Sequence, residues 1–177
     1  MPKLCVFCGS SMGTDPAFSD AARALGRALA ERGVGLVYGG AHRGLMGLLA
    51  DSVLADGGTV IGVIPERLVE LEIAHRGLTH LHVVKTMHER KALMAAHADA
   101  FLALPGGFGT LEEFMEVLTW AQLGYHDKPL GMLNISGYYD GLLSWIAYAE
   151  RQGLVSSAHA ARIRVSANVA EALAQLL

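Results

Sequence analysis

The sequence predicts a single α/β domain over residues 1–177, built on a doubly wound parallel sheet of about seven strands with helices on both faces. Short apolar runs typical of buried strands alternate with longer amphipathic runs along the whole chain. Glycine-rich turns follow several of the apolar runs. The length also suits one hydrophobic core, so no second domain is expected.

The expected elements follow from this alternation. Strand-like apolar runs cover residues 4–8, 35–38, 59–64, 80–84, 100–104, 129–133 and 162–165. Helical patterns cover residues 16–32, 44–56, 87–98, 111–123, 138–152 and 167–176. Strands and helices that alternate in this way are joined by right-handed crossovers, which gives a Rossmann-like architecture.

Ligands of such sheets bind beyond the carboxyl ends of the strands. The turns after residues 8, 38, 64 and 104 are therefore expected to face one cleft. The one long connection without a clear pattern, residues 65–79, is the expected lid or rim of that cleft.

The composition is apolar for a chain of this size, with 52% hydrophobic residues and a mean hydropathy of +0.34. No apolar run reaches the roughly 20 residues of a membrane span, so we expect no membrane partner. We expect a homodimer instead, whose interface buries the apolar surface that a single chain would leave exposed. The net charge of −3 and the lack of a basic cluster argue against a nucleic-acid partner.

The N-terminal residues lead directly into the first strand without the features of a signal peptide, so a cytoplasmic location is expected. Cys5 and Cys8 form a C-x-x-C pair. Positions three apart in a strand lie about 10 Å apart on opposite faces, so we expect two buried thiols and no disulfide.

Three glycine-rich turns occupy residues 9–11, 39–47 and 106–110. Each alone is also typical of an ordinary strand-to-helix connection, but three at one sheet edge favour a nucleotide-sized site that binds an anion. None contains the Gly-Lys-Ser/Thr of a Walker loop, and Glu112 stands where a dinucleotide motif needs its last glycine. A nucleotide triphosphatase and a dinucleotide cofactor are therefore disfavoured.

The acids after the third turn have two interpretations. Thr110 and Glu113 have the spacing of a capping box, in which Glu113 only satisfies the start of its own helix, and acids there also suit the helix dipole. Alternatively, Glu113 and Glu116 lie one turn apart on the same helix face and converge near a ligand beyond Gly109. Glu112 is expected to point elsewhere, into solvent.

Arg90 and Lys91 lie near the start of a helix that is expected to follow Thr86, with Glu89 completing its cap. Cations at this end oppose the helix dipole, so either they are simply exposed or a group outside the helix attracts them. The planar donors of arginine suit a phosphate or a carboxylate.

Histidines do not predict a metal site. His80 and His82 share one face of a strand and His88 neighbours Arg90, but no third ligand stands at metal-binding spacing.

The motifs around these residues resemble those of the lonely-guy family of cytokinin-activating phosphoribohydrolases, once labelled lysine decarboxylases. The family signature P-G-G-x-G-T-x-x-E stands at residues 105–113, and its M-H-x-R-K stands at 87–91. The likeness includes the turns at residues 8–11 and 39–47, where Gly-Gly-Ala replaces three glycines, and extends to about residue 133. The C-terminal helices carry no family signature.

The resemblance implies hydrolysis of the N-glycosidic bond of a cytokinin riboside 5′-monophosphate, or of AMP, by a dimer without metal or organic cofactor. By position, it implies Arg90 and Glu113 as the catalytic pair. It implies nucleotide contacts from Lys91, Gly107, Gly109, Thr110 and Thr119, and from Glu72 in the 65–79 connection. The other candidate substrate-binding residues lie in the turns and on the following helix: Gly9, Ser10, Gly40, Met46, Phe108, Leu111, Glu112 and Glu116.

The residue types suit this chemistry. Cleavage builds positive charge on the ribose, and the Glu113 carboxylate would either stabilise that charge or activate the attacking water. The start of the following helix would hold the 5′-phosphate. Either Glu116 or water would protonate the departing base.

Two other functions are weighed. One is non-catalytic binding of a nucleotide or of the molybdenum cofactor by a protein of the same fold. The other, lysine decarboxylation, is disfavoured because it usually needs pyridoxal phosphate on a lysine, and no suitable context surrounds Lys3, Lys85, Lys91 or Lys128.

Overall fold

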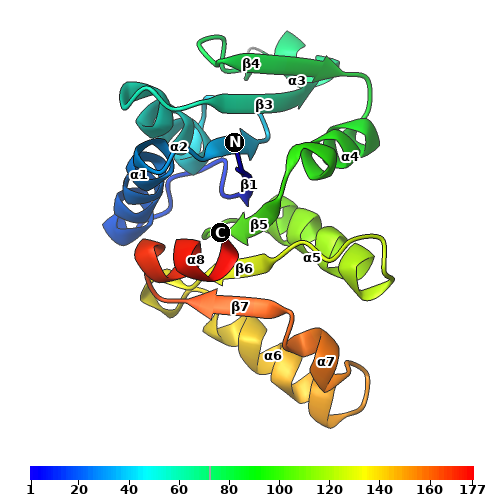
Figure 1. The fold of residues 1–177 in the computed structure, drawn as a ribbon. Coiled ribbons are helices and arrows are strands. Elements are labelled where there is room, and N and C mark those ends of the chain that lie inside the picture. The colour runs from blue at the N-terminus through cyan, green and yellow to red at the C-terminus, as the bar shows by residue number, and fades with distance from the viewer. Residues whose placement is uncertain (72) are drawn as a thin grey trace.

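Seven parallel strands form one sheet in the computed structural model, which describes residues 1–71 and 73–177 (Figure 1). The order across the sheet is β4-β3-β2-β1-β5-β6-β7. The strands are β1 (Lys3–Phe7), β2 (Gly35–Tyr38), β3 (Val60–Pro65), β4 (His80–Val84), β5 (Ala100–Ala103), β6 (Leu130–Leu133) and β7 (Ile163–Ser166).

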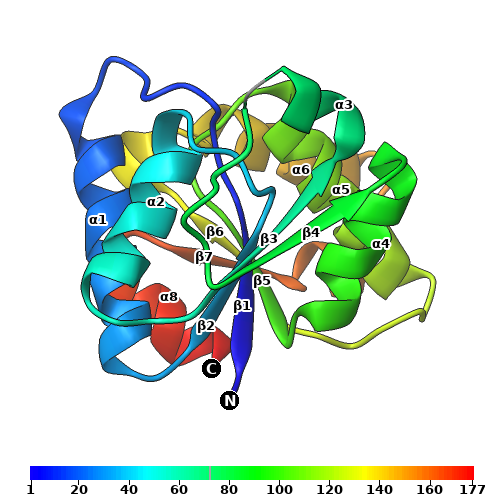
Figure 2. The ribbon, with the colours of Figure 1, turned by 90° about the horizontal axis from the view of Figure 1, so that it is seen from above.

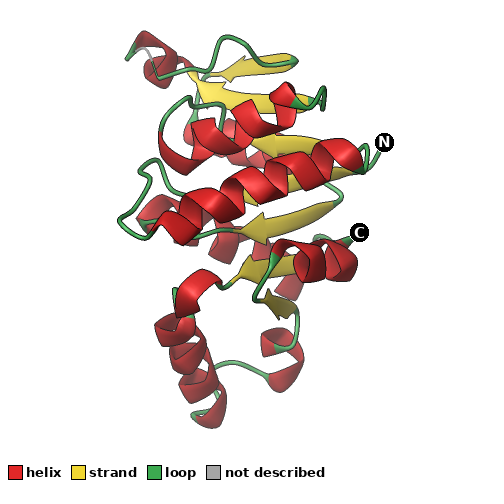
Figure 3. Cartoon of the chain, turned by 90° about the vertical axis from the view of Figure 1, so that its left-hand side faces the viewer, coloured by secondary structure: helices red, strands yellow, loops and turns green. Residues whose placement is uncertain are grey.

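Helices cover both faces of the sheet (Figure 2). One face carries α1 (Pro16–Glu31), α2 (Gly44–Ala55) and α8 (Val169–Leu176), which lie in front of the sheet in Figure 3. The other face carries α4 (Met87–His97), α5 (Phe108–Gln122) and α6 (Asp140–Arg151). The short elements are α3 (Glu66–Glu70), the 3₁₀ turn η1 (Ile135–Gly137) and α7 (Ser157–Ala160).

Side chains alternate along β1 and divide the core into two layers. Leu4 and Val6 pack in the cluster beneath α1, α2 and α8, whereas Cys5 and Phe7 pack in the cluster beneath α4 and α5. Cys8 lies in the first of these clusters, so the two thiols are buried, free and on opposite faces, as expected.

The strand order reverses between β1 and β5. From β1 the chain winds outward through β2, β3 and β4, then crosses to β5 and winds outward in the other direction. Phe7 pairs with Ala103 at the carboxyl ends of β1 and β5, and just beyond them the Gly9 N–H donates to the Pro105 carbonyl at 3.1 Å. The first and third glycine turns therefore lie side by side where open α/β sheets bind ligands.

The predicted fold class is confirmed, and each predicted strand is present with bounds that shift by one residue at most. The predicted starts of three helices are wrong, because α5 begins at Phe108, α6 at Asp140 and α8 at Val169. The sequence analysis missed α3, which lies inside the 65–79 connection, as well as η1 and α7. Elements this short do not span enough residues to show a helical period.

Within the described parts of the chain, no helix is both long and apolar enough to cross a membrane.

Candidate active site

A cavity of about 390 Å³ opens at the carboxyl edge of the sheet. Turns after β1, β2 and β5 meet there with the starts of α4 and α5 and with residues on either side of position 72. The lining residues are Cys8, Ser10, Ala41, Met46, Leu68, Ile73, Met87, Arg90, Gly107, Phe108, Gly109, Thr110, Glu112 and Glu113.

Helix α5 starts at this cavity without a side-chain cap. Its N-cap is Gly107, so the helix begins at Phe108 and Thr110 lies inside the first turn. Among the described residues, the N–H groups of Phe108, Gly109 and Thr110 have no hydrogen-bond partner. The positive end of the helix dipole and several free donors therefore meet the cavity, which is an arrangement suited to an anion.

This start excludes the capping-box interpretation of Thr110 and Glu113. With Gly107 as the N-cap, Glu113 lies in the second turn of α5, too far along to reach the N-cap backbone. Its carboxylate is available for another role.

The Glu113 carboxylate is largely withdrawn from water, with its side chain 14% exposed. Burial raises its pKa to about 7 and outweighs the opposing attraction of Arg90, while Glu112 and Glu116 raise the pKa further and Lys91 lowers it. The closest ion-pair contact joins Glu113 Oε1 to Arg90 Nη1 at 4.0 Å, which is longer than a hydrogen bond. A carboxyl group with a pKa near neutrality is suited to accept a proton during catalysis.

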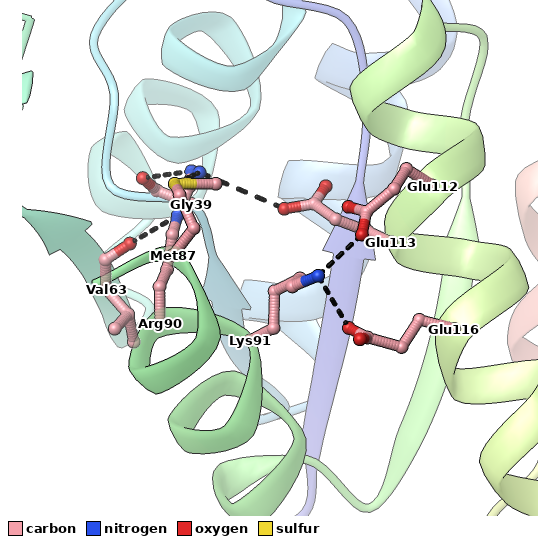
Figure 4. A network of polar contacts seen from close by, with 8 residues as sticks. All are labelled: Gly39, Val63, Met87, Arg90, Lys91, Glu112, Glu113 and Glu116. Atoms are coloured by element: carbon pink, nitrogen blue, oxygen red, sulfur yellow. Dashed lines mark hydrogen bonds and ion pairs between the residues drawn. The ribbon is translucent and has the colours of Figure 1, made fainter.

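Arg90 is held in place by backbone carbonyls (Figure 4). Its Nε donates to the Val63 carbonyl at 3.0 Å and its Nη2 donates to the Gly39 carbonyl at 2.7 Å. Its Nη1 contacts the Met87 sulfur at 3.8 Å and faces Glu113. The side chain is only 9% exposed, so these contacts fix a buried cation against the ends of β2 and β3.

Lys91 joins two other acids of α5 (Figure 4). Its Nζ lies 2.5 Å from Glu112 Oε1 and 3.1 Å from Glu116 Oε2, and the hydrogen bond to Glu112 is the main reason that its pKa is raised. The expectation that Glu112 points elsewhere is therefore wrong, since it pairs with Lys91 and lines the cavity, whereas the expectation that it is solvated agrees with a side chain that is 54% exposed. Both cations of α4 have acidic partners on α5, which explains their unfavourable place near a helix start.

The remaining predicted site residues are dispersed. Gly9 lines a smaller neighbouring cavity, and the Gly40 carbonyl accepts a hydrogen bond from the His75 N–H at 2.8 Å. Leu111 packs in the core, and the exposed Thr119 donates to the Met115 carbonyl of its own helix at 2.7 Å. None of these residues lines the larger cavity, and neither does Glu116. Glu72 lies outside the described residues.

Sequence reasoning predicted Met46 and Phe108 among the apolar residues that line the cavity but missed the others. Cys8, Ala41, Leu68, Ile73 and Met87 all line it. Cys8 and Met87 belong to motifs noted in the sequence. Their positions, at the end of a strand and at the start of a helix, could have indicated that they line the site. Leu68 and Ile73 have no such signal because α3 itself was not predicted.

No three metal-ligating side chains converge within residues 1–71 and 73–177. The ring of His82 stacks on that of His97 at a centroid distance of 5.2 Å, and desolvation lowers the pKa of His97.

Comparisons with known proteins bear on the family of this chain. A family model described as "possible lysine decarboxylase" matches residues 46–176. A cytokinin riboside 5′-monophosphate phosphoribohydrolase of Arabidopsis thaliana is 52% identical, over 99% of this chain and 82% of that protein. The enzyme of the same name from Rhodococcoides fascians is 51% identical, over 97% of this chain and 87% of that protein. The chain belongs to this phosphoribohydrolase family. The resemblance inferred from the motifs is confirmed.

Solved structures of other proteins share the fold of this phosphoribohydrolase family member. The molybdenum cofactor carrier protein of Chlamydomonas reinhardtii superposes with a TM-score of 0.71 at 24% identity, covering 98% of this chain and 93% of that one. Identity this low shows a common fold alone.

Gly39→Ala is predicted to dislodge Arg90. A Cβ at position 39 would overlap the guanidinium of Arg90 and would lie 2.6 Å from the Met46 methyl carbon. Losing the charge-assisted hydrogen bonds of a buried arginine should lower the free energy of unfolding by about 2 kcal/mol, measured by urea denaturation.

Gly141→Ala is the matched control, because a Cβ at position 141 meets no atom within 4 Å. It should leave stability unchanged or raise it by less than about 1 kcal/mol. Equal stability of the Gly39→Ala and parent proteins would show that Arg90 is not fixed as described.

Proposed function

We propose that this protein hydrolyses the N-glycosidic bond of a cytokinin riboside 5′-monophosphate, or of AMP, and releases the free base and ribose 5-phosphate. Family membership supports the reaction type. The observation that carries the proposal is a buried Glu113 carboxylate, free of any capping role, beside an uncapped helix start in one cavity.

The start of α5 would hold the 5′-phosphate. The free N–H groups of residues 108–110 and the helix dipole attract a dianion, and Ser10 lines the same cavity. Anchoring the phosphate fixes the ribose, so that binding energy at a remote group is used at the reacting carbon. Phe108 is 94% exposed at this helix start and can cover a bound nucleotide.

Glu113 would act on the anomeric carbon. As the bond from C1′ to the base nitrogen breaks, its electron pair leaves with the base and positive charge develops on the ribose. The Glu113 carboxylate stabilises that charge and takes a proton from the attacking water as the new C1′–O bond forms. The positive charge of Arg90 opposes the effect of burial on the pKa of Glu113 and keeps part of the carboxyl group ionised at neutral pH.

The departing base must gain a proton. Glu116 is paired with Lys91 and does not line the cavity, so it is poorly placed as the donor. We propose that a water molecule delivers this proton to the base nitrogen and regains one from the protonated Glu113, which returns to its carboxylate form.

Non-catalytic binding of a nucleotide or of the molybdenum cofactor receives less support. The structural likeness to a molybdenum cofactor carrier reaches only 24% identity, against 52% for a phosphoribohydrolase. A binding protein also has no need for a buried carboxyl group with a raised pKa next to the phosphate site. Retention of nucleotide without release of base would favour it.

The assembly is proposed to be a cytoplasmic homodimer that binds neither nucleic acid nor membrane. Large apolar side chains support a buried interface: Tyr125, Trp145, Tyr148 and Leu154 are all more than half exposed. The net charge of −3 supports a small-molecule substrate over nucleic acid.

Glu113→Gln is predicted to abolish base release while preserving the fold. The amide keeps the shape of the side chain but removes the negative charge that opposes the ribose cation, so kcat should fall about 100-fold or more. Chromatography of the products from AMP, a prenylated AMP and their ribosides measures the effect and identifies the preferred base.

Glu150→Gln is the control, since it makes the same change on α6 and lies outside the cavity lining. It should match the parent. A folded Glu113→Gln variant that releases base at the parental rate would refute the proposed role of Glu113.

The pH profile is predicted to follow Glu113. Because its pKa is raised from 4.5 to about 7, the carboxyl group is protonated and inactive below that value. Activity as kcat/KM should therefore fall about tenfold per pH unit as the pH drops below 7, and it should level off above 7.

The substrate phosphate also titrates near pH 6, so the glutamate must be followed separately. Carbon-13 NMR of the carboxyl groups, with Glu113→Gln identifying the signal, makes that measurement. A Glu113 signal that titrates near 4.5 would contradict the proposal.

The dimer is tested by mass in solution. Light scattering at micromolar concentration should give about twice the 18.8 kDa of one chain. The mass of a single chain would contradict it.

A further inference from the structure

The turn that follows β5 is held by hydrogen bonds to three consecutive carbonyl groups, those of residues 104–106. The Tyr139 hydroxyl donates to the first at 2.6 Å, the Gly9 N–H to the second at 3.1 Å and the Tyr138 hydroxyl to the third at 2.5 Å. Two of the three donors are adjacent tyrosines that lie more than thirty residues further along the chain. No motif that links the chain to its family includes them.

The hydrogen bond from Tyr138 orients the peptide group between Gly106 and Gly107, whereas the Leu104 carbonyl that Tyr139 binds precedes Pro105, which has no N–H. The N–H and C=O of a trans peptide point in opposite directions, and the described chain contains no cis peptide. With the Gly106 carbonyl bound to Tyr138, the N–H of Gly107 must point away from Tyr138. Gly107 lines both the cavity that contains Glu113 and the smaller cavity of about 250 Å³, whereas Tyr138 lines only the smaller one, so an N–H that points away from Tyr138 is directed toward the cavity with Glu113.

The two tyrosines are themselves fixed. The turn η1 has left-handed backbone at Ser136 (φ 52°) and Gly137 (φ 70°), and the Tyr139 N–H donates to the Asn134 side chain at 2.7 Å. Tyr139 is buried, and burial raises the pKa of its hydroxyl, which therefore remains a donor. Tyr138 packs edge-on against the ring of Phe18 at 5.3 Å, so its hydroxyl is also preorganised.

We propose that Tyr138 and Tyr139 are positioning residues for the phosphate turn: Tyr138 binds the Gly106 carbonyl and so directs the Gly107 N–H toward the anion, while Tyr139 binds the Leu104 carbonyl and so holds the beginning of the turn in place. This inference rests on the proposed function only in assuming that a phosphate binds there. The tyrosines need not touch the substrate. Their effect is on the affinity for the phosphate group rather than on the reacting carbon.

Tyr138→Phe is the decisive variant, because it removes one hydroxyl from a ring that is 44% exposed and leaves the contact with Phe18. Calorimetry with ribose 5-phosphate should show about tenfold weaker binding, the effect of one lost hydrogen bond. The KM for AMP should rise by the same factor while kcat changes less than about threefold. Cleavage of adenosine, which has no phosphate, should keep its kcat/KM.

Tyr148→Phe is the matched control, since it makes the same change on α6 at a side chain with no hydrogen bond to the turn. It should behave as the parent. Tyr139→Phe should also weaken the binding of ribose 5-phosphate. If this variant fails to fold, the affinity of Tyr138→Phe alone decides whether the inference holds.

The outcomes separate this inference from the proposed function. Parental affinity of Tyr138→Phe for ribose 5-phosphate would overturn the inference even where AMP is hydrolysed. Equal losses on AMP and adenosine would also overturn it, because they indicate a general structural role. If the parent releases no base from AMP, the proposed function fails, and calorimetry with ribose 5-phosphate still tests the tyrosines. A parent protein that does not bind ribose 5-phosphate would refute the inference.

Discussion

The site depends on one buried cation. A guanidinium that is withdrawn from water must have its donors satisfied, and Arg90 meets this need with the carbonyls of Gly39 and Val63 at the ends of β2 and β3. Those two bonds connect α4 to the carboxyl edge of the sheet and turn the remaining nitrogen toward Glu113. They also require glycine at position 39, because a Cβ there would overlap the guanidinium. The second glycine turn thus serves the arginine as well as any ligand.

The distance between Arg90 and Glu113 sets the chemistry of the carboxyl group. A tight bidentate pair would hold the pKa of a glutamate well below its usual value. At 4.0 Å the attraction is weaker than the cost of burial, so the pKa of Glu113 rises to about 7. The same separation leaves Glu113 oxygen atoms free to meet a sugar or a water. Arg90 therefore acts as a fixed neighbour that moderates the effect of burial without neutralising the carboxylate.

Two identical sequence patterns show how far the sequence could predict this site. Thr86 and Glu89 form the capping box that T-x-x-E spacing predicts, whereas Thr110 and Glu113 do not, because the glycines before them let α5 begin at Phe108. The β–α alternation could be predicted because short, mainly apolar runs of strand length alternate with longer runs of helix length along the chain. The hydrogen-bond acceptors of Arg90 could not be predicted from the sequence, because they are backbone carbonyls and every residue has one. The hydroxyls of Tyr138 and Tyr139 were missed for a related reason, since only tertiary folding brings η1 beside the third glycine turn.

The three acids of α5 differ in role because their cationic partners differ. Lys91 lies within ion-pair distance of both Glu112 and Glu116, and its side chain is as well shielded as that of Arg90. Glu113 is left with a single distant partner and with two like charges beside it on the same helix, both of which raise its pKa. Burial, a distant cationic partner and neighbouring acids all favour the protonated form of a carboxyl group, so proton transfer is expected at Glu113. Lys91 thereby acts on the site indirectly, because its ion pairs hold Glu112 and Glu116 in place next to the group that exchanges the proton.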